Sequence, residues 1–155
     1  MKGKILAILL LSMLIIITAS TKAATENVFE EQAAGYRYKV TIQDPSSKWE
    51  IGYKDETFII FENENNKDYL AKYMNNVQEL NIQIITLIIY TVYLILVFVI
   101  TYLAKKKMKI KTSILVLIVF AFGIYAFINI IPAAIKINSS FNEANKYFEI
   151  LAKNS

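Results

Sequence analysis

The sequence predicts an α+β membrane protein. We expect an N-terminal signal or anchor helix, a small extracytoplasmic antiparallel three-stranded β-meander, and a long transmembrane helical hairpin that an amphipathic C-terminal helix extends outside the membrane. The 155 residues are 55% hydrophobic, with a mean hydropathy of +0.40, and the apolar excess is gathered into three runs. Two of these runs reach the ~20 residues that a spanning helix needs. A polar segment with period-two alternation separates the first run from the second.

The first apolar run, residues 5–19, follows Lys2 and Lys4 and precedes several small residues. A basic start, an apolar stretch of roughly 7–15 residues and small residues at a cleavage position are the layout of a signal peptide. An uncleaved anchor helix is the alternative, for which the run is short against the ~20 residues of a span. We therefore expect residues 1–20 to form a signal peptide or an uncleaved anchor.

The second and third apolar runs, residues 80–104 and 112–132, contain no Asp, Glu, Lys or Arg. Each is long enough to cross a bilayer, which takes about 20 residues. Only the segment 105–111 separates them, so two spanning helices would have to form an antiparallel hairpin. This short connection carries five lysines: Lys105, Lys106, Lys107, Lys109 and Lys111.

The charge distribution predicts which side of the membrane each segment occupies. Residues 21–79 carry seven basic and eleven acidic side chains, whereas the loop 105–111 carries only basic ones. By the positive-inside rule the loop is cytoplasmic in a plasma membrane, and residues 21–79 and 133–155 are extracytoplasmic. We expect the lysines to set this topology and to contact anionic lipid. A short loop fixed at both ends offers little surface for nucleic acid, so none is expected to bind.

The polar segment, residues 21–65, predicts three strands. Residues 35–43 alternate apolar and polar side chains, which is typical of a half-buried strand. A turn at residues 44–47 precedes a second alternation from Trp49 to Tyr53, and a reversal at Lys54 precedes an apolar third strand. Three short strands with one apolar face need a cover to form a core.

We expect the helix that follows the strands to supply that cover, and a second helical seam in the tail to pair with it. Apolar residues recur at spacings of three and four in two sets: Leu70, Tyr73, Val77, Leu80 and Ile84, and then Ile137, Phe141, Ala144, Phe148 and Leu151. The first set continues into the second apolar run without Gly or Pro, which predicts one helix over residues 66–107. Folding the hairpin about Met108 brings Leu80 level with Ile137 and Leu70 level with Phe148, so the outer helices should pair.

The tail, residues 133–155, is expected to form its own amphipathic helix. Ser140 with Glu143 matches a capping box at a helix start. Pro132 predicts a kink between this helix and the third apolar run, because proline lacks a backbone donor and clashes with the preceding turn.

Composition removes most catalytic chemistry. The chain has no cysteine and no histidine, so it lacks a thiolate nucleophile, the commonest general base and the commonest transition-metal ligand. The acid pairs at residues 55–56 and in 62–64 do not have the spacing of a calcium loop and are interpreted as solvated turns. We therefore predict no enzyme activity, no catalytic residue, no cofactor and no metal.

Five aromatic residues are candidates for docking a partner: Tyr36, Trp49, Tyr53, Tyr90 and Tyr93. Each has an alternative structural role. The first three share one face of the meander and can instead form its buried side. The last two share one helix face with Thr86 and Thr101, where hydroxyls can instead pack helix on helix.

The leading functional hypothesis is a non-enzymatic accessory or scaffold protein whose extracytoplasmic domain docks on or stabilises a larger membrane or cell-surface assembly. Its expected partners are membrane lipid and another membrane or cell-surface protein, and self-association into a homo-oligomer stays open. A small immunity protein that neutralises a toxin is the alternative, compatible with the size and the hairpin. A channel or transporter component is disfavoured because the two spans carry no charged residue to line a path.

Overall fold

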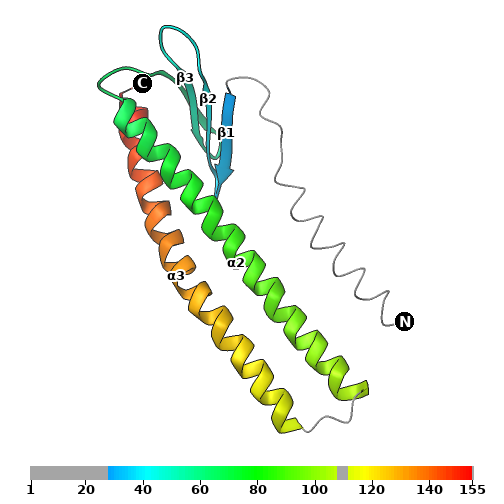
Figure 1. The fold of residues 1–155 in the computed structure, drawn as a ribbon. Helices are drawn as coiled ribbons and strands as arrows, with labels where there is room; N and C mark the ends of the chain where they lie inside the picture. The colour runs from blue at the N-terminus through cyan, green and yellow to red at the C-terminus, as the bar shows by residue number, and fades with distance from the viewer. Residues whose placement is uncertain (1–27, 108–111, 155) are drawn as a thin grey trace.

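A computed structural model of the protein describes residues 28–107 and 112–154, and shows a small β-sheet beside one end of two long helices (Figure 1). The predicted signal or anchor segment, residues 1–20, lies outside the described residues. The elements in chain order are β1 (Val28–Ala33), β2 (Tyr36–Thr41), β3 (Lys48–Tyr53), β4 (Glu56–Phe61), α2 (Lys67–Lys107) and α3 (Thr112–Lys153).

The four strands form one antiparallel sheet in the order β1-β2-β3-β4. Two-residue loops close the first and third hairpins. Ala34 and Gly35 both have positive φ, 48° and 90°, which is the pair of conformations that a type I′ turn requires. Lys54, with φ 52°, begins the turn between β3 and β4. The turns predicted at residues 44–47 and at Lys54 are confirmed.

The prediction of three strands was wrong, because β1 adds a fourth. Phe29, Glu31 and Ala33 lie on the inner face of the sheet, as their pairing with the inward residues of β2 shows, although Phe29 is left 54% exposed. A carboxylate in the middle of that face hides the apolar alternation. Glu31 accepts a hydrogen bond from Asn81 of α2, 50 residues further along the chain. Its inward orientation therefore depends on a residue that is distant in the sequence. Gly35, which takes positive φ without a steric cost, was the local signal for this turn.

The two helices form an antiparallel pair of 41 and 42 residues. α2 begins and ends where the sequence predicts, within one residue. α3 differs from the prediction, because it continues through Pro132 as one helix from the apolar run to the tail. Ser140 therefore lies inside a helix and is only 5% exposed, so the predicted capping box at a separate tail helix was wrong.

Contacts between the helices confirm the predicted register. The Lys136 ammonium lies 3.2 Å from the Glu79 carboxylate, and the rings of Tyr69 and Tyr147 lie 6.3 Å apart. Deeper in the hairpin, the rings of Tyr90 and Tyr125 lie 6.2 Å apart. Each pair joins residues almost equally distant from the centre of the loop. The outer seams of the two helices therefore meet, as their spacing predicts.

The core lies where the inner face of the sheet meets the outer ends of both helices. α2 packs against β1 and β2, and α3 packs against β3. Tyr73 of α2 is fully buried there, and its hydroxyl lies 2.9 Å from the carbonyl oxygen of Gly52 and 3.1 Å from that of Arg37. One side chain therefore joins α2 to two neighbouring strands. The buried hydrophobic residues of this core are Ala33, Tyr36, Tyr38, Val40, Trp49, Ile51, Ile60, Leu70, Tyr73, Val77, Leu80, Ala144, Phe148 and Leu151.

The remaining length of the helices is apolar and exposed. The most apolar windows of α2 and α3 have mean hydropathies of 2.7 and 2.8, and 0% and 11% of their residues are buried. By length and composition, both helices could cross a membrane. Large apolar side chains cover this surface, such as Phe98 at 60% exposure and Leu117 at 71%.

Gly52 of β3 provides a test of the outer face of the sheet. A Cβ atom there would lie 2.8 Å from Nε of Arg37 and 2.9 Å from the backbone oxygen of Glu56. Arg37 uses this space to donate a 2.6 Å hydrogen bond to the carbonyl oxygen of Lys54 in the turn. Gly52→Ala should therefore lower the free energy of unfolding by about 1–3 kcal/mol, the usual cost of overpacking.

The measurement for Gly52→Ala is the urea concentration at the midpoint of unfolding in detergent, monitored by the fluorescence of Trp49. Lys48→Ala, on the same strand and the same face, is the matched control and should change stability by less than about 0.5 kcal/mol. Equal midpoints for the two variants would show that Gly52 is not required by the packing of Arg37.

Candidate functional site

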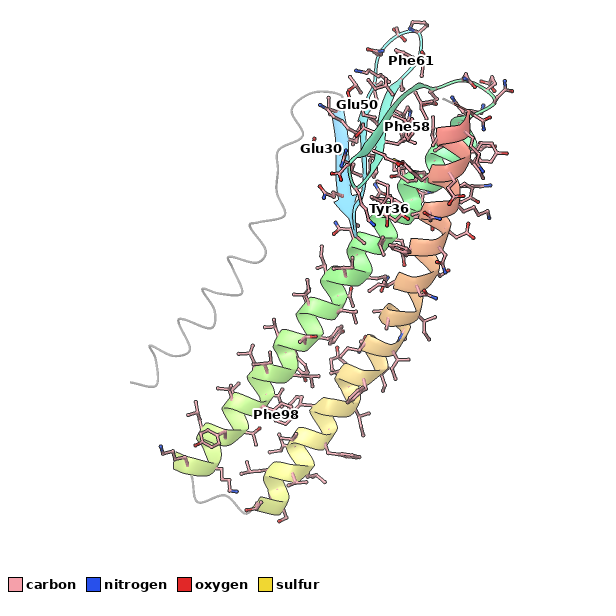
Figure 2. The ribbon with its side chains drawn as sticks, turned by 180° about the vertical axis from the view of Figure 1, so that it is seen from behind. Glu30, Tyr36, Glu50, Phe58, Phe61 and Phe98 are labelled. Carbon is pink, nitrogen blue, oxygen red and sulfur yellow. The ribbon has the colours of Figure 1, made fainter. Side chains whose placement is uncertain are left out.

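Tyr36, Trp49 and Tyr53 lie on the inner face of the sheet. Tyr36 has no exposed surface, stacks on Tyr53 at a centroid distance of 4.3 Å, and donates a 3.0 Å hydrogen bond to Oδ1 of Asn145 in α3. Figure 2 shows Tyr36 and Phe58 on the side of the sheet that faces the helices. Burial raises the pKa of the Tyr36 hydroxyl to about 12. Tyr36 therefore has a structural role and offers no ring face to a partner.

Trp49 also belongs to the core. It is 6% exposed, and its indole nitrogen donates a 2.9 Å hydrogen bond to the carboxylate of Glu62 beyond β4. The burial of Tyr36 and Trp49 supports the structural alternative, in which these aromatic residues form the buried side of the sheet. Tyr53 is half-buried at the edge of the same cluster.

Tyr90 and Tyr93 lie between α2 and α3. The ring of Tyr93 is in edge-to-face contact with Phe122 and Tyr125, at 6.2 Å from each, and Tyr90 contacts Tyr125 at the same distance. Both tyrosines of α2 are half-buried, whereas Tyr125 is 56% exposed. The aromatic cluster therefore packs helix on helix along one side and stays open along the other.

The lysines lie at the far end of the hairpin from the sheet. Lys105 and Lys106 are exposed in the last turns of α2, and Lys107 is its last residue. Lys109 and Lys111 lie outside the described residues. Across the described part of the helices, no acidic side chain lies between Glu79 and Glu143.

A polar network ties β1 and β2 to α2. Gln78 donates a 2.7 Å hydrogen bond to the Tyr38 hydroxyl, which in turn lies 3.4 Å from the Glu31 carboxylate that Asn81 contacts. Burial is the main cause of a raised pKa at Tyr38, partly opposed by the hydrogen bond from Gln78. These satisfied partners give the network a positioning role, which fixes the sheet against the helix.

An ion pair between Glu79 of α2 and Lys136 of α3 joins the helices between their apolar lengths and the core. Hydrogen bonds from Gln83 and then from Lys136 lower the pKa of Glu79. Both charged side chains remain partly exposed, so the pair contributes at most about 1 kcal/mol. It joins α2 to α3 at residues that lie almost equally far from the loop.

The surface that sequence reasoning missed is on β4. Ile59 and Phe61 point away from the helices and are 56% and 55% exposed, whereas Ile60 between them is buried. β4 is also an edge strand of the sheet. Residues 58–61 are apolar at odd and even positions alike, so the sequence shows two apolar faces but not which of them is exposed.

The outer face beside β4 is charged. Glu30, Lys39 and Glu50 alternate in sign across three paired strands, and the Lys48 ammonium lies 3.2 Å from the Glu50 carboxylate. Figure 2 shows Glu30 and Glu50 on the side of the sheet turned away from the helices. The exposed apolar pair therefore borders a solvated, mixed-charge surface.

Within residues 28–107 and 112–154, no three acidic side chains lie close enough together to hold a metal ion. Comparison with models of protein families found no match, and neither did comparison with curated proteins or with solved structures. The function of the chain therefore has to be inferred from its described surfaces, which are the β4 edge and the apolar lengths of the helices.

Proposed function

We propose that this chain is a non-enzymatic integral membrane protein that acts as an accessory or scaffold subunit of a larger membrane or cell-surface assembly. In this proposal α2 and α3 span a plasma membrane, the loop 105–111 is cytoplasmic, and residues 21–79 and 133–155 are extracytoplasmic. The asymmetry of charge between the loop and residues 21–79 supports the orientation. The exposed apolar surface of both helices supports the insertion.

The way the sheet is mounted supports a docking role. Both helices continue from their apolar lengths into the core without a break, and residues of both contact the sheet. The sheet is thereby held at a fixed position relative to the apolar lengths of the helices. A rigid mount suits a protein that presents one surface to a partner, because little conformational entropy is lost on binding.

The observation that carries the proposal is the edge strand β4. An edge strand presents unpaired backbone groups, and proteins usually protect it with lysine, proline or a covering element. β4 has neither lysine nor proline, and its outward side chains include the exposed pair Ile59 and Phe61. The opposite edge, β1, carries Glu30 and Glu31 instead. We infer that an extended apolar segment of the partner pairs with β4.

The test is purification of the tagged full-length chain from its native host in mild detergent, with mass spectrometry of the proteins that accompany it. The test variant is Ile59→Thr with Phe61→Thr, because threonine keeps strand propensity while removing apolar surface. The matched control is Phe29→Thr with Ile42→Thr, an equally exposed aromatic and aliphatic pair away from β4, at 54% and 49% exposure.

We expect one stoichiometric membrane or cell-surface partner with the parent chain and with the control pair. Recovery of that partner should fall by about tenfold or more with the β4 pair, the loss typical of interface residues that dominate binding. A partner retained by the β4 variant would show that docking uses another surface. Recovery of the chain without any partner would contradict the accessory role itself.

A further inference from the structure

A groove lies between α2 and α3 at the end of the hairpin that carries the lysines. It consists of two adjoining hollows of about 400 and 330 Å³ that share Phe98, Val119 and Phe120. Because they share three residues, they form one continuous surface, which we call the hairpin groove. Its walls are almost entirely apolar, and each hollow has a volume in the range of small-molecule sites, roughly 300–1,000 Å³.

Gly123 of α3 keeps one wall of the hairpin groove open. A Cβ atom added at Gly123 would meet no other atom within 4 Å. The glycine is therefore not needed for a close approach of α2, and a Cβ atom at this position in the groove wall displaces neither helix. The structure thus contains a position at which the groove can be filled selectively.

The end of the hairpin groove nearest the loop is polar and basic. Lys105 and Thr112 line it, and both are exposed. The sequence has no acid between Glu79 and Glu143 that could neutralise the Lys105 ammonium group. An anionic group at the mouth of the groove would therefore be attracted, with a hydroxyl donor beside it.

The length of the hairpin groove suits one leaflet of a bilayer. Its α3 wall extends from Thr112 to Phe127. At 1.5 Å per residue this distance is roughly 22 Å. Half of a hydrocarbon core is about 15 Å thick, so one extended acyl chain that starts at the lysine end can lie within the groove.

We propose that the hairpin groove binds an acyl chain of an anionic phospholipid whose phosphate lies at Lys105 and Thr112. This inference rests on the membrane insertion proposed above, but not on the docking of a partner at β4. A transmembrane helix is the competing occupant. Interfaces between such helices are rich in small residues, whereas the groove is bordered by Phe98, Phe120 and Phe127, and an apolar helix would leave Lys105 without a counter-charge.

The experiment measures which lipid contacts the groove. The full-length chain with Phe120→Trp is reconstituted into vesicles of phosphatidylglycerol and phosphatidylcholine, in which either one lipid or the other carries brominated acyl chains that quench tryptophan. The parent chain, whose sole tryptophan is Trp49 in the sheet, supplies the background. We expect phosphatidylglycerol to be preferred at the reporter by about fivefold over its share of the bilayer, as one lysine near an anionic head group predicts.

Two variants separate the contributions of chain and head group. Gly123→Leu should fill the groove and reduce quenching by either lipid, and Ala121→Leu is its control, because Ala121 is exposed on the same helix and does not line the groove. Lys105→Gln should abolish the preference for phosphatidylglycerol. Lys106→Gln removes an equal charge from a residue outside the groove lining and should keep it.

The proposal would be overturned if both lipids quenched the Phe120→Trp chain equally. It would also be overturned if Gly123→Leu, added to this chain, left the quenching unchanged. Weak quenching by both lipids, together with crosslinking of Phe120→Trp chains into a defined oligomer, would assign the groove to a helix instead. If the chain failed to float with vesicles at all, the membrane insertion itself would be wrong. A bound lipid without any protein partner would contradict only the accessory role.

Discussion

Replacing Phe148 with alanine should lower the free energy of unfolding by about 3–5 kcal/mol, the range for deleting a buried phenyl ring. Phe148 is 4% exposed and is the one residue of α3 whose ring meets aromatic rings of three strands and of α2. The rings it contacts belong to Tyr36, Tyr53, Phe58 and Tyr73, at centroid distances of 5.7 to 6.3 Å. Its removal would leave a cavity where both helices and the sheet meet.

The measurement is the urea concentration at the midpoint of unfolding of the sheet and the helix ends that cover it, in detergent and monitored by the fluorescence of Trp49. Because small domains have a total stability of only about 5–15 kcal/mol, this loss should move the midpoint far toward zero denaturant. The matched control is Phe29→Ala, which removes an equal ring that is 54% exposed and should change stability by less than about 0.5 kcal/mol. Similar midpoints for the two variants would place the core elsewhere.

The helical part of this core was predictable from the sequence. Leu70, Tyr73, Val77 and Leu80 are all fully buried, and they recur with the spacing of one helix face. The lysine-rich loop fixes how far each seam lies from the turn, so the register of two antiparallel helices follows from counting residues. The period of a helix and the length of its connection are local properties, which is why this part of the prediction was confirmed.

The sheet was less predictable because its pairing depends on distant residues. β1 was missed because Glu31 faces the core, where its carboxylate accepts hydrogen bonds from Asn81 of α2 and from Tyr38. A strand with aromatic residues at alternate positions has the same sequence pattern whether that face is covered or exposed. Tyr36 and Trp49 were therefore compatible with docking until Phe148 and Tyr73 were seen to cover that face.

The exposed pair on β4 could not be located for a related reason. Residues that are apolar on both faces are typical of a central strand, which is covered on both sides. β4 has this composition, yet it lies at the edge of a sheet that is covered on one side only. Strand order decides the exposure of Ile59 and Phe61, and strand order is not written in the sequence of β4 itself.

High pH should unfold the core between the sheet and the helices through its buried tyrosines. Burial raises the pKa of Tyr36 to about 12, and burial also raises the pKa of Tyr73. Both hydroxyls ionise near pH 10 in the unfolded chain. The folded state therefore holds more protons than the unfolded state above pH 10, so stability should be constant below about pH 10 and fall between about pH 10 and 12.

The urea midpoint at about pH 8 and about pH 11.5, read from circular dichroism, measures this loss, and absorbance at 295 nm reports tyrosinate formation. Tyr73→Phe removes an ionisable group from the core. At pH 8 it should cost about 1 kcal/mol for the lost hydrogen bond, but its midpoint should fall less between the two pH values than that of the parent chain. Tyr69→Phe, at a position 39% exposed, should leave the fall unchanged. An equal fall in all three chains would show that the alkaline transition does not arise from the tyrosines that join the helices to the sheet.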